Sequence, residues 1–382
     1  MKLGILYPSS AAHPEIAIDF MGGLKTFFKK AELESHIQLF AESIGYGGVE
    51  KEVYQKSEKL IMISAVDVLV AFIDLKVLPI LEPLIFASGK LMIVVNPGAN
   101  YPQNWIAQPN IIFLTLHHAF LCWLCGASAA KNNPRDSAMA TSLYDCGYMH
   151  SAAMIRNFVK SGGSLNFNYI NKQTGDQPFQ IDELMSFLST NTKADHLLCV
   201  FDSVPAFNFY KQLSTFDETS RLHLFASPMM LEDKALSGLP EESKFSISGY
   251  TPWQSSSNNA ENREFKNYYV QQTRRPSNIF ALLGWETGLI LQQVFQRNNG
   301  DYAEGEDLVN QLLKIKLNGP RGELKFDENT HYILAPVVQY KLNKGPGPAI
   351  ESIKEIDEEW LSFVSEPFEG ISSGWTNTYL CY

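Results

Sequence analysis

Short apolar runs alternate with amphipathic stretches along most of the chain. Residues 3–7, 66–73 and 91–95 are almost continuously apolar, which is typical of strands in a sheet that is buried on both faces. Between the first two runs, residues 16–30 place large apolar side chains near one face of a helix. Strand and helix patterns that follow one another in this way predict parallel sheets covered by helices.

The same alternation occurs twice, which predicts two α/β halves. In the first half we expect strands at 3–7, 36–42, 66–73, 91–95 and 111–116, with helices at 16–30, 77–87 and from 119 onward. In the second half we expect strands at 138–143, 165–169, 196–201, 223–226 and 245–250, with helices at 149–160, 181–190 and 205–213. A polar stretch at 252–259 then marks a boundary before two further helices, 260–272 and 280–297.

A turn motif follows these helices. Gly319-Pro320 cannot continue a helix, and Gly322 tolerates backbone angles that other residues avoid. Leu324 and Phe326 then alternate with charged residues, as in a half-buried strand. The motif therefore predicts a tight turn that leads into a strand, followed by a second extended run at 332–342.

The order G-P-R-G-x-L-x-F-D, a short turn and A-P-V-V-Q-Y resembles the end of type I periplasmic substrate-binding proteins, especially the branched-chain amino-acid-binding group of ABC transporters. The resemblance implies an α/β protein with two Rossmann-like lobes, whose parallel sheets are joined by a hinge that the chain crosses three times, near His117, Trp253 and Gly322. It implies an N-terminal lobe of residues 1–117 and 253–321 and a C-terminal lobe of residues 118–252 and 322–344. Residues 345–382 are then an extra C-terminal segment, and its aromatic residues predict that it packs on the body.

Composition agrees with a large globular protein. A chain of 382 residues with 45% hydrophobic residues exceeds what one core usually serves, so two lobes are expected. The formal net charge of −10 and the lack of a Lys/Arg cluster argue against a nucleic-acid partner. The most apolar region, 60–95, is interrupted by charged residues, so no membrane insertion is expected.

Two further features bear on compartment and chemistry. Met1-Lys2 leads directly into the first strand, so we expect a periplasmic protein if a leader was removed from this chain, and otherwise a cytoplasmic one. The five cysteines are an odd number in mostly apolar settings, which is not a disulfide framework. Cys122 and Cys125 lie in an apolar helix, so we expect them to pack as small hydrophobic residues and not to bind a metal. We expect no cofactor.

In open α/β sheets, ligands collect at the C-terminal ends of the strands. One such loop, Asn96-Pro97-Gly98-Ala99-Asn100, is similar to the S-P-G-A-T-type loop that holds an amino acid's α-carboxylate in the family named above. Gly98 and Ala99 permit close backbone approach, and the Asn100 amide can donate in place of the hydroxyl. The alternative is a plain polar turn.

The other positions match that family less well. Cys146 holds the place of a frequent aromatic residue, and Met229 holds the place of the acid that pairs with an amino acid's ammonium group. A thioether cannot pair with a buried ammonium group. Either Asp202 or Asp145 therefore substitutes from across the cleft, or the ligand lacks that group, or the cleft holds no ligand of that type. Branched-chain amino acids are therefore expected to bind weakly. The expected ligand-binding residues are Ser9, Leu75, Asn96, Ala99, Asn100, Asp145, Cys146, Asp202 and Met229.

These observations predict a non-catalytic protein that closes two lobes on a small polar or amino-acid-like ligand, as the substrate-binding component of an ABC-type uptake system. Its partner would be a membrane transporter permease or a signalling protein that recognises the closed form. One alternative is a cytoplasmic or tethered ligand sensor of the same fold. A second is an α/β enzyme that uses Asp74, Asp145, Asp202 or His117. The chain has no G-x-G-x-x-G after a strand, no Walker loop and no H-E-x-x-H to support that enzyme.

Overall fold

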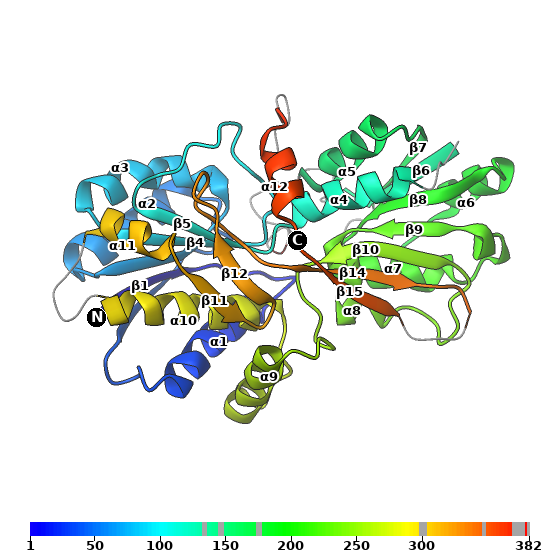
Figure 1. Cartoon of the computed structure of the whole chain (residues 1–382). Helices are drawn as coiled ribbons and strands as arrows, with labels where there is room; N and C mark the ends of the chain where they lie inside the picture. Colours follow the sequence, from blue (N-terminus) through cyan, green and yellow to red (C-terminus); the bar gives the residue numbers. More distant parts are fainter. Residues whose placement is uncertain are drawn as a thin grey trace.

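Two separate sheets organise the protein into two lobes that lie side by side (Figure 1). The structure is a computed structural model, and it describes residues 1–131, 136–143, 149–172, 178–297, 304–345, 349–368 and 379. The first lobe has an eight-stranded sheet in the order β11 (Lys316–Gly319), β12 (Gly322–Phe326), β13 (Tyr332–Leu334), β5 (Ile111–Thr115), β4 (Leu91–Asn96), β3 (Val68–Phe72), β1 (Lys2–Tyr7) and β2 (Gln38–Ser43). The second lobe has a seven-stranded sheet in the order β15 (Ile350–Lys354), β14 (Val337–Leu342), β10 (Ser246–Thr251), β9 (His223–Ala226), β8 (Ala194–Val200), β6 (Asp136–Ser142) and β7 (Leu165–Asn171).

Helices cover both sheets, as the alternating pattern predicts. The first lobe carries α1 (Ile16–Lys30), α2 (Glu50–Glu58), α3 (Leu78–Ser88), α9 (Ala260–Thr273), α10 (Ile279–Arg297) and α11 (Gly305–Leu312). The second lobe carries α4 (His118–Lys131), α5 (Met149–Lys160), α6 (Asp182–Thr190), α7 (Ser203–Leu213) and α8 (Asp233–Leu236). Short helical turns lie at η1 (Lys59–Ile63), η2 (Leu75–Val77), η4 (Asp217–Arg221) and η5 (Pro228–Leu231).

The central strands show why the sequence forms parallel sheets. Every residue of β3, β4 and β5 is buried, and β3 pairs in parallel with β4, which pairs in parallel with β5. Strands covered by helices on both faces need such continuous apolar runs. The α/β class predicted from the sequence is therefore confirmed.

The G-P-R-G motif forms a hairpin within the first lobe. β11 and β12 are antiparallel, with Gly319 opposite Gly322, and β12 continues into β13, which pairs with β5 of the same sheet. The predicted turn and strand are present, but the predicted division between residues 321 and 322 is wrong. The chain passes to the second sheet only at Ala335-Pro336, between β13 and β14. The other two passages, after β5 and after β10, lie near His117 and Trp253 as expected.

The segment after residue 345 packs against both lobes. β15 extends the second sheet by pairing with β14. The helix α12 (Asp357–Val364) lies between the lobes in Figure 1 and buries Trp360 and Phe363. The Trp360 ring lies 5.3 Å from that of Trp105 in the first lobe, and Phe363 lies 5.8 Å from Trp123 at the start of the second.

A close contact between α1 and α10 gives a stability prediction. A Cβ atom on Gly23 would lie 2.0 Å from the backbone oxygen of Ala281 in α10, so the two helices could not remain at this distance. Gly23→Ala is expected to lower the free energy of unfolding by about 1–3 kcal/mol or more, measured by urea denaturation. Gly22→Ala is the matched control, since the nearest atoms to its Cβ would be side-chain atoms of Tyr269 at 3.3 Å and of Thr273 at 3.5 Å. Equal losses in the two variants would contradict the close-packing account.

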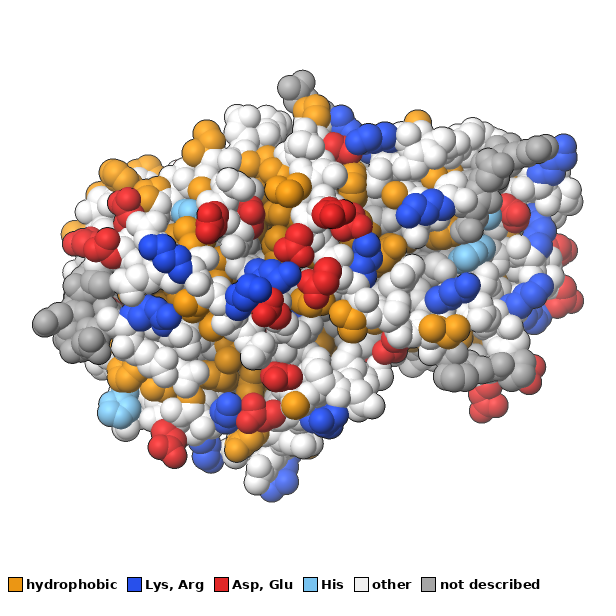
Figure 2. Space-filling view, viewed as in Figure 1, with side chains coloured by type: hydrophobic (Ala, Val, Ile, Leu, Met, Phe, Trp, Pro, Cys, Tyr) orange, Lys and Arg blue, Asp and Glu red, His pale blue; other side chains and the backbone are white. Residues whose placement is uncertain are grey.

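The surface is mixed in charge. Acidic and basic side chains are interspersed over the face seen in Figure 2. One example is Lys325, whose ammonium group lies 3.1 Å from carboxylate oxygens of both Glu355 and Asp357. Within the described ranges, none of the helices combines the length and the apolar character needed to span a membrane.

Candidate functional site

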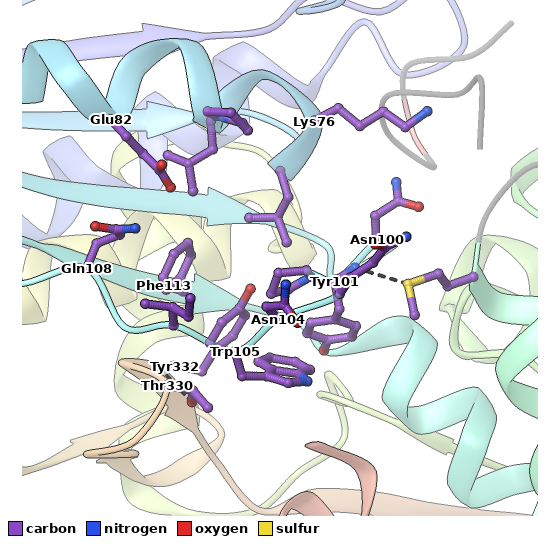
Figure 3. A pocket seen from close by; sticks show the side chains of 17 residues that line it. Lys76, Glu82, Asn100, Tyr101, Asn104, Trp105, Gln108, Phe113, Thr330 and Tyr332 are labelled. Carbon is purple, nitrogen blue, oxygen red and sulfur yellow. Dashed lines mark hydrogen bonds between the residues drawn. The ribbon is translucent and has the colours of Figure 1, made fainter. Parts of the chain in front are cut away.

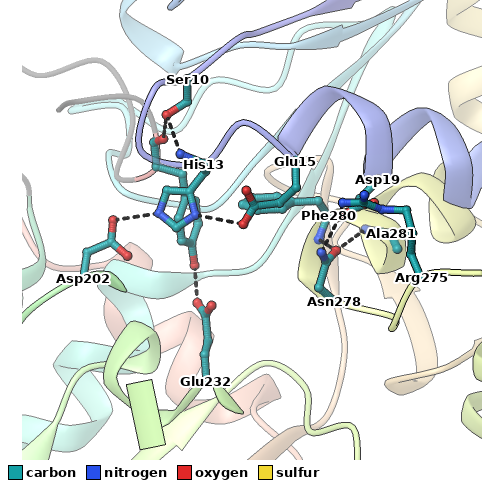
Figure 4. Close-up of polar contacts among 11 residues, drawn as sticks. Ser10, His13, Glu15, Asp19, Asp202, Glu232, Arg275, Asn278, Phe280 and Ala281 are labelled. Atoms are coloured by element: carbon teal, nitrogen blue, oxygen red, sulfur yellow. Dashed lines mark hydrogen bonds and ion pairs between the residues drawn. The ribbon is translucent and has the colours of Figure 1, made fainter. Parts of the chain in front are cut away.

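The loops that follow the parallel strands of the two sheets meet between the lobes. His13 follows β1 in the first lobe, and Asp202 follows β8 in the second. The His13 Nε2 atom lies 3.5 Å from the Asp202 Oδ2 atom (Figure 4). This contact places the C-terminal ends of both sets of strands around one interlobe site, which is where open α/β sheets bind ligands.

The His13 ring is held from both sides. Its Nδ1 atom lies 3.5 Å from Glu15 Oε1, and its backbone N–H donates to Ser10 Oγ at 3.1 Å. His13 and Asp202 are only 3% and 4% exposed. Burial lowers the pKa of His13, but the charges of Asp202 and Glu15 more than offset this and raise the pKa to about 10. The ring is therefore positively charged at neutral pH, and its contact with Glu15 lowers the pKa of that acid to about 2.

A second acid from the second lobe completes the cluster. Glu232 follows β9, and its Oε1 atom accepts a hydrogen bond of 2.6 Å from the Tyr379 hydroxyl. Burial raises the pKa of Glu232 to about 8, and the neighbouring charge of Asp202 contributes in the same direction. Two acids and one histidinium thus lie between the lobes.

Glu232 corrects the expectation for the end of β9. Met229, predicted to stand in the place of an acid, is 1% exposed and packs in the apolar core. The turn η5 carries the chain past Met229, so the acid follows three residues later. The structure thus places an acid near the end of β9 that the sequence analysis did not identify, and the weak binding of branched-chain amino acids stays a prediction.

Aromatic rings surround the charged groups. Phe280, near the start of α10, lies 5.8 Å from the His13 ring at 73°. The Tyr379 ring lies 5.0 Å from His13 and 5.8 Å from His118 at the start of α4. Burial lowers the pKa of His118 well below its usual value, so this ring is neutral. Its Nδ1 atom has no hydrogen-bond partner among the described residues.

Three predicted residues come from the loop after β4. The Asn96 side chain accepts a hydrogen bond of 2.9 Å from the Gly98 backbone, and its Nδ2 atom has no partner among the described residues. The backbone oxygen of Ala99 accepts from Met149 of the second lobe at 3.2 Å. Asn100 donates to Asp74 at 3.0 Å, while burial raises the pKa of Asp74 to about 6. All three residues are buried, and whether the loop holds a ligand stays a prediction.

Two of the predicted residues, Leu75 and Asn100, line a separate cavity of about 540 Å³ (Figure 3). Its walls are formed by α3, β5, β13 and the loop after β4, including the rings of Trp105 and Tyr332. The Tyr332 side chain is 2% exposed, and its hydroxyl has no partner among the described residues. Asp202 does not line this cavity, so the structure divides the predicted residues between the cavity and the interlobe cluster.

The remaining predicted residues contribute less. Ser9 is exposed, and the neighbouring Ser10 makes the contacts to His13 and Tyr379 instead. Asp145 and Cys146 lie outside the described residues. His117, one candidate for an enzyme, is structural: its ring nitrogens lie 2.8 Å from the Tyr101 hydroxyl and 2.9 Å from the Ile333 backbone oxygen.

The cysteines of α4 are buried. Cys122 and Cys125 are buried in α4 and form no disulfide, and burial raises the pKa of Cys125 to about 12. No group of three or more His, Cys, Asp or Glu side chains among the residues described is arranged to hold a metal ion. The absence of a metal or cofactor stays a prediction.

Sequence reasoning missed His13, Glu232 and Tyr379. His13-Pro14-Glu15 follows the first strand, so its position alone was a usable signal for the first of these. Glu232 was missed because the turn η5 separates it from the end of β9. The contact between Ser10 and Tyr379 joins residues 369 positions apart, and no local pattern reports such a contact.

Comparisons with known proteins agree on one family. A family model described as "Periplasmic binding protein" matches residues 2–346. A search of curated proteins found no match.

Solved structures share the fold at low sequence identity. A solute-binding protein of an ABC transporter from R. palustris, in complex with benzoate, has a TM-score of 0.71 and 17% identity over 91% of this chain and 97% of that one. An ABC transporter substrate-binding protein from Sphaerobacter thermophilus has a TM-score of 0.76 and 15% identity over 93% and 97%. A leucine-binding protein from Thermotoga maritima has a TM-score of 0.67 and 13% identity over 94% and 99%.

Proposed function

Because the chain belongs to the periplasmic binding protein family, we propose that it binds one small polar solute between its lobes as the substrate-binding component of an ABC-type uptake system. Family membership confirms the prediction of a non-catalytic binding protein. Binding between the lobes couples the solute to lobe closure, and the closed form is what a transporter permease recognises. We propose the periplasm as the compartment, in keeping with the family.

The observation that carries the proposal is the buried cluster of His13, Asp202 and Glu232. Ionisable side chains are rarely buried without a function or a partner. These three come from opposite lobes and lie at the ends of parallel strands, so a solute that contacts all of them holds the lobes together. The histidinium suits a carboxylate or another acceptor, and the two acids suit a hydroxyl or ammonium donor.

The solved relatives support a class of solute. One is named for benzoate and another for leucine, both small molecules with a carboxylate and an apolar body. The cluster in this protein offers the same combination, with His13 for the carboxylate and the edge of Phe280 for the apolar part. We therefore propose a small organic acid or amino acid as the solute.

Calorimetry with leucine, benzoate and 4-hydroxybenzoate tests this proposal. At least one of them is expected to bind with one-to-one stoichiometry. Asp202→Asn is expected to weaken that binding at least tenfold, because it removes the negative charge that faces His13 and holds the ring charged.

Asp195→Asn is the matched control, because Asp195 also pairs with a histidine, His196, at 2.7 Å but is half exposed and lies away from the cluster. Asp195→Asn should bind the solute with the same affinity as the wild type. The proposal fails if Asp202→Asn and Asp195→Asn bind the solute with the same affinity.

A further inference from the structure

The Tyr379 side chain occupies the space between the lobes. It is 1% exposed, although the groups around it come from loops on both sides of the site. A buried tyrosine at this position fills volume that a solute would otherwise take.

Tyr379 contacts the first lobe through its ring and its backbone. The ring meets His13 at 5.0 Å and 86°, and Phe280 at 5.1 Å and 87°. These edge-to-face contacts are favourable arrangements of aromatic rings. The Ser10 hydroxyl donates to the Tyr379 backbone oxygen at 2.6 Å, so the residue is also fixed in position along the first lobe.

Tyr379 contacts the second lobe through its hydroxyl. This group donates to Glu232 Oε1 at 2.6 Å, a short hydrogen bond between a phenol and a carboxyl group. The ring also meets His118, at the beginning of the second lobe, at 5.8 Å and 71°. One side chain therefore joins groups from both lobes, which is what a solute does in a protein that closes around it.

We propose that Tyr379 is an internal occupant of the solute position, and that the solute which displaces it carries a phenol ring. The inference rests on the proposed function, since it takes the space between His13 and Glu232 as the solute site. A displacing molecule must replace the edge contacts to His13 and Phe280 and the donor to Glu232. A phenol ring replaces all of them. A phenolic acid and free tyrosine share this chemistry.

An internal occupant lowers the apparent affinity for every solute by the same factor. The reason is that only the fraction of molecules with Tyr379 displaced can bind, and the apparent dissociation constant is the intrinsic one divided by that fraction. A tethered side chain competes at a high effective concentration. Tyr379→Ala is therefore expected to bind 4-hydroxybenzoate at least tenfold more tightly than the wild type, measured by calorimetry.

Two comparisons isolate the parts of the proposal. Tyr379→Phe keeps the ring but loses the hydroxyl, so its affinity should fall between the wild type and Tyr379→Ala. On Tyr379→Ala, 4-hydroxybenzoate should bind at least tenfold more tightly than benzoate, and a comparison with L-tyrosine identifies which phenol source fits. Tyr46→Ala, at an exposed tyrosine of the first lobe, should match the wild type.

Each outcome decides a distinct point. Equal affinity of Tyr379→Ala and the wild type for 4-hydroxybenzoate would overturn the internal occupant while solute binding stands. Equal binding of benzoate and 4-hydroxybenzoate by Tyr379→Ala would overturn the phenol assignment. If neither protein binds any of these solutes, the proposed function itself fails.

Discussion

Replacing Arg321 by alanine is expected to lower the free energy of unfolding by about 3–5 kcal/mol. The Arg321 and Glu286 side chains are 2% and 0% exposed, and Arg321 donates to the two Glu286 carboxylate oxygens over 2.7–3.1 Å. It also donates to the Thr115 backbone oxygen at 3.1 Å, next to the first passage between the lobes. Loss of the guanidinium leaves a buried carboxylate without its cation. Urea denaturation of the wild type and the variant measures this change in the free energy of unfolding.

An exposed ion pair on the same hairpin is the control for this prediction. Lys316 lies 2.9 Å from Glu323, and their side chains are 63% and 38% exposed. Lys316→Ala should change stability by less than about 1 kcal/mol, as is usual for surface pairs. If Arg321→Ala fails to fold, Arg321→Lys serves in its place. It keeps the positive charge but loses the bidentate hydrogen bonding to Glu286, so its free energy of unfolding should fall by less. A loss below about 1 kcal/mol for Arg321→Ala would contradict the account.

Stability is expected to fall as the pH rises from about 6.5 to about 10 because of His13. Its folded-state pKa is about 10 against 6.5 for an unperturbed histidine, so folding favours the protonated ring. That contribution is fully present below pH 6.5 and is lost as the pH approaches 10, with a size of up to about 5 kcal/mol. Glu232, whose pKa is raised from 4.5 to about 8, acts in the same direction between those values. Urea denaturation at several pH values measures the slope.

His13→Asn should remove most of the slope above pH 9, where Glu232 is already largely ionised. His36→Asn is the control, since His36 is exposed and lies outside the cluster. A wild-type stability that stays flat between pH 7 and pH 10, or a slope above pH 9 that survives in His13→Asn, would show that His13 is not charged in the folded protein.

The fold was predictable from the sequence because its signals are local. Continuous apolar runs such as 68–72 and 91–95 specify strands that are buried on both faces. The turn at Gly319–Gly322 was also recognisable from its residues. The sequence did not show which lobe contains the strand after this turn. β12 belongs to the first sheet because it pairs with β13, which in turn pairs with β5. Pairing of that kind depends on residues about 220 positions apart.

The site was predictable only in part, for the same reason. Asp202 was identified because it directly follows a strand, and the Asn96–Asn100 loop because of its small residues. His13, Glu232 and Tyr379 form one cluster only after the lobes meet. The position of Met229 shows how a single short turn, η5, moves an acid by three residues relative to a family pattern.

Native mass spectrometry with two variants tests most directly whether the solute binds between His13 and Glu232. The proteins to compare are the wild type, His13→Ala and Trp105→Ala, each with the tightest-binding solute of the calorimetric panel. Trp105 lines the cavity of about 540 Å³, which is the alternative location for the solute, so this pair of variants separates the two locations. We expect one solute per chain in the wild type and in Trp105→Ala, and none in His13→Ala at the same concentration. Solute retained by His13→Ala and lost from Trp105→Ala would contradict the claim and place the binding site in the cavity of Figure 3.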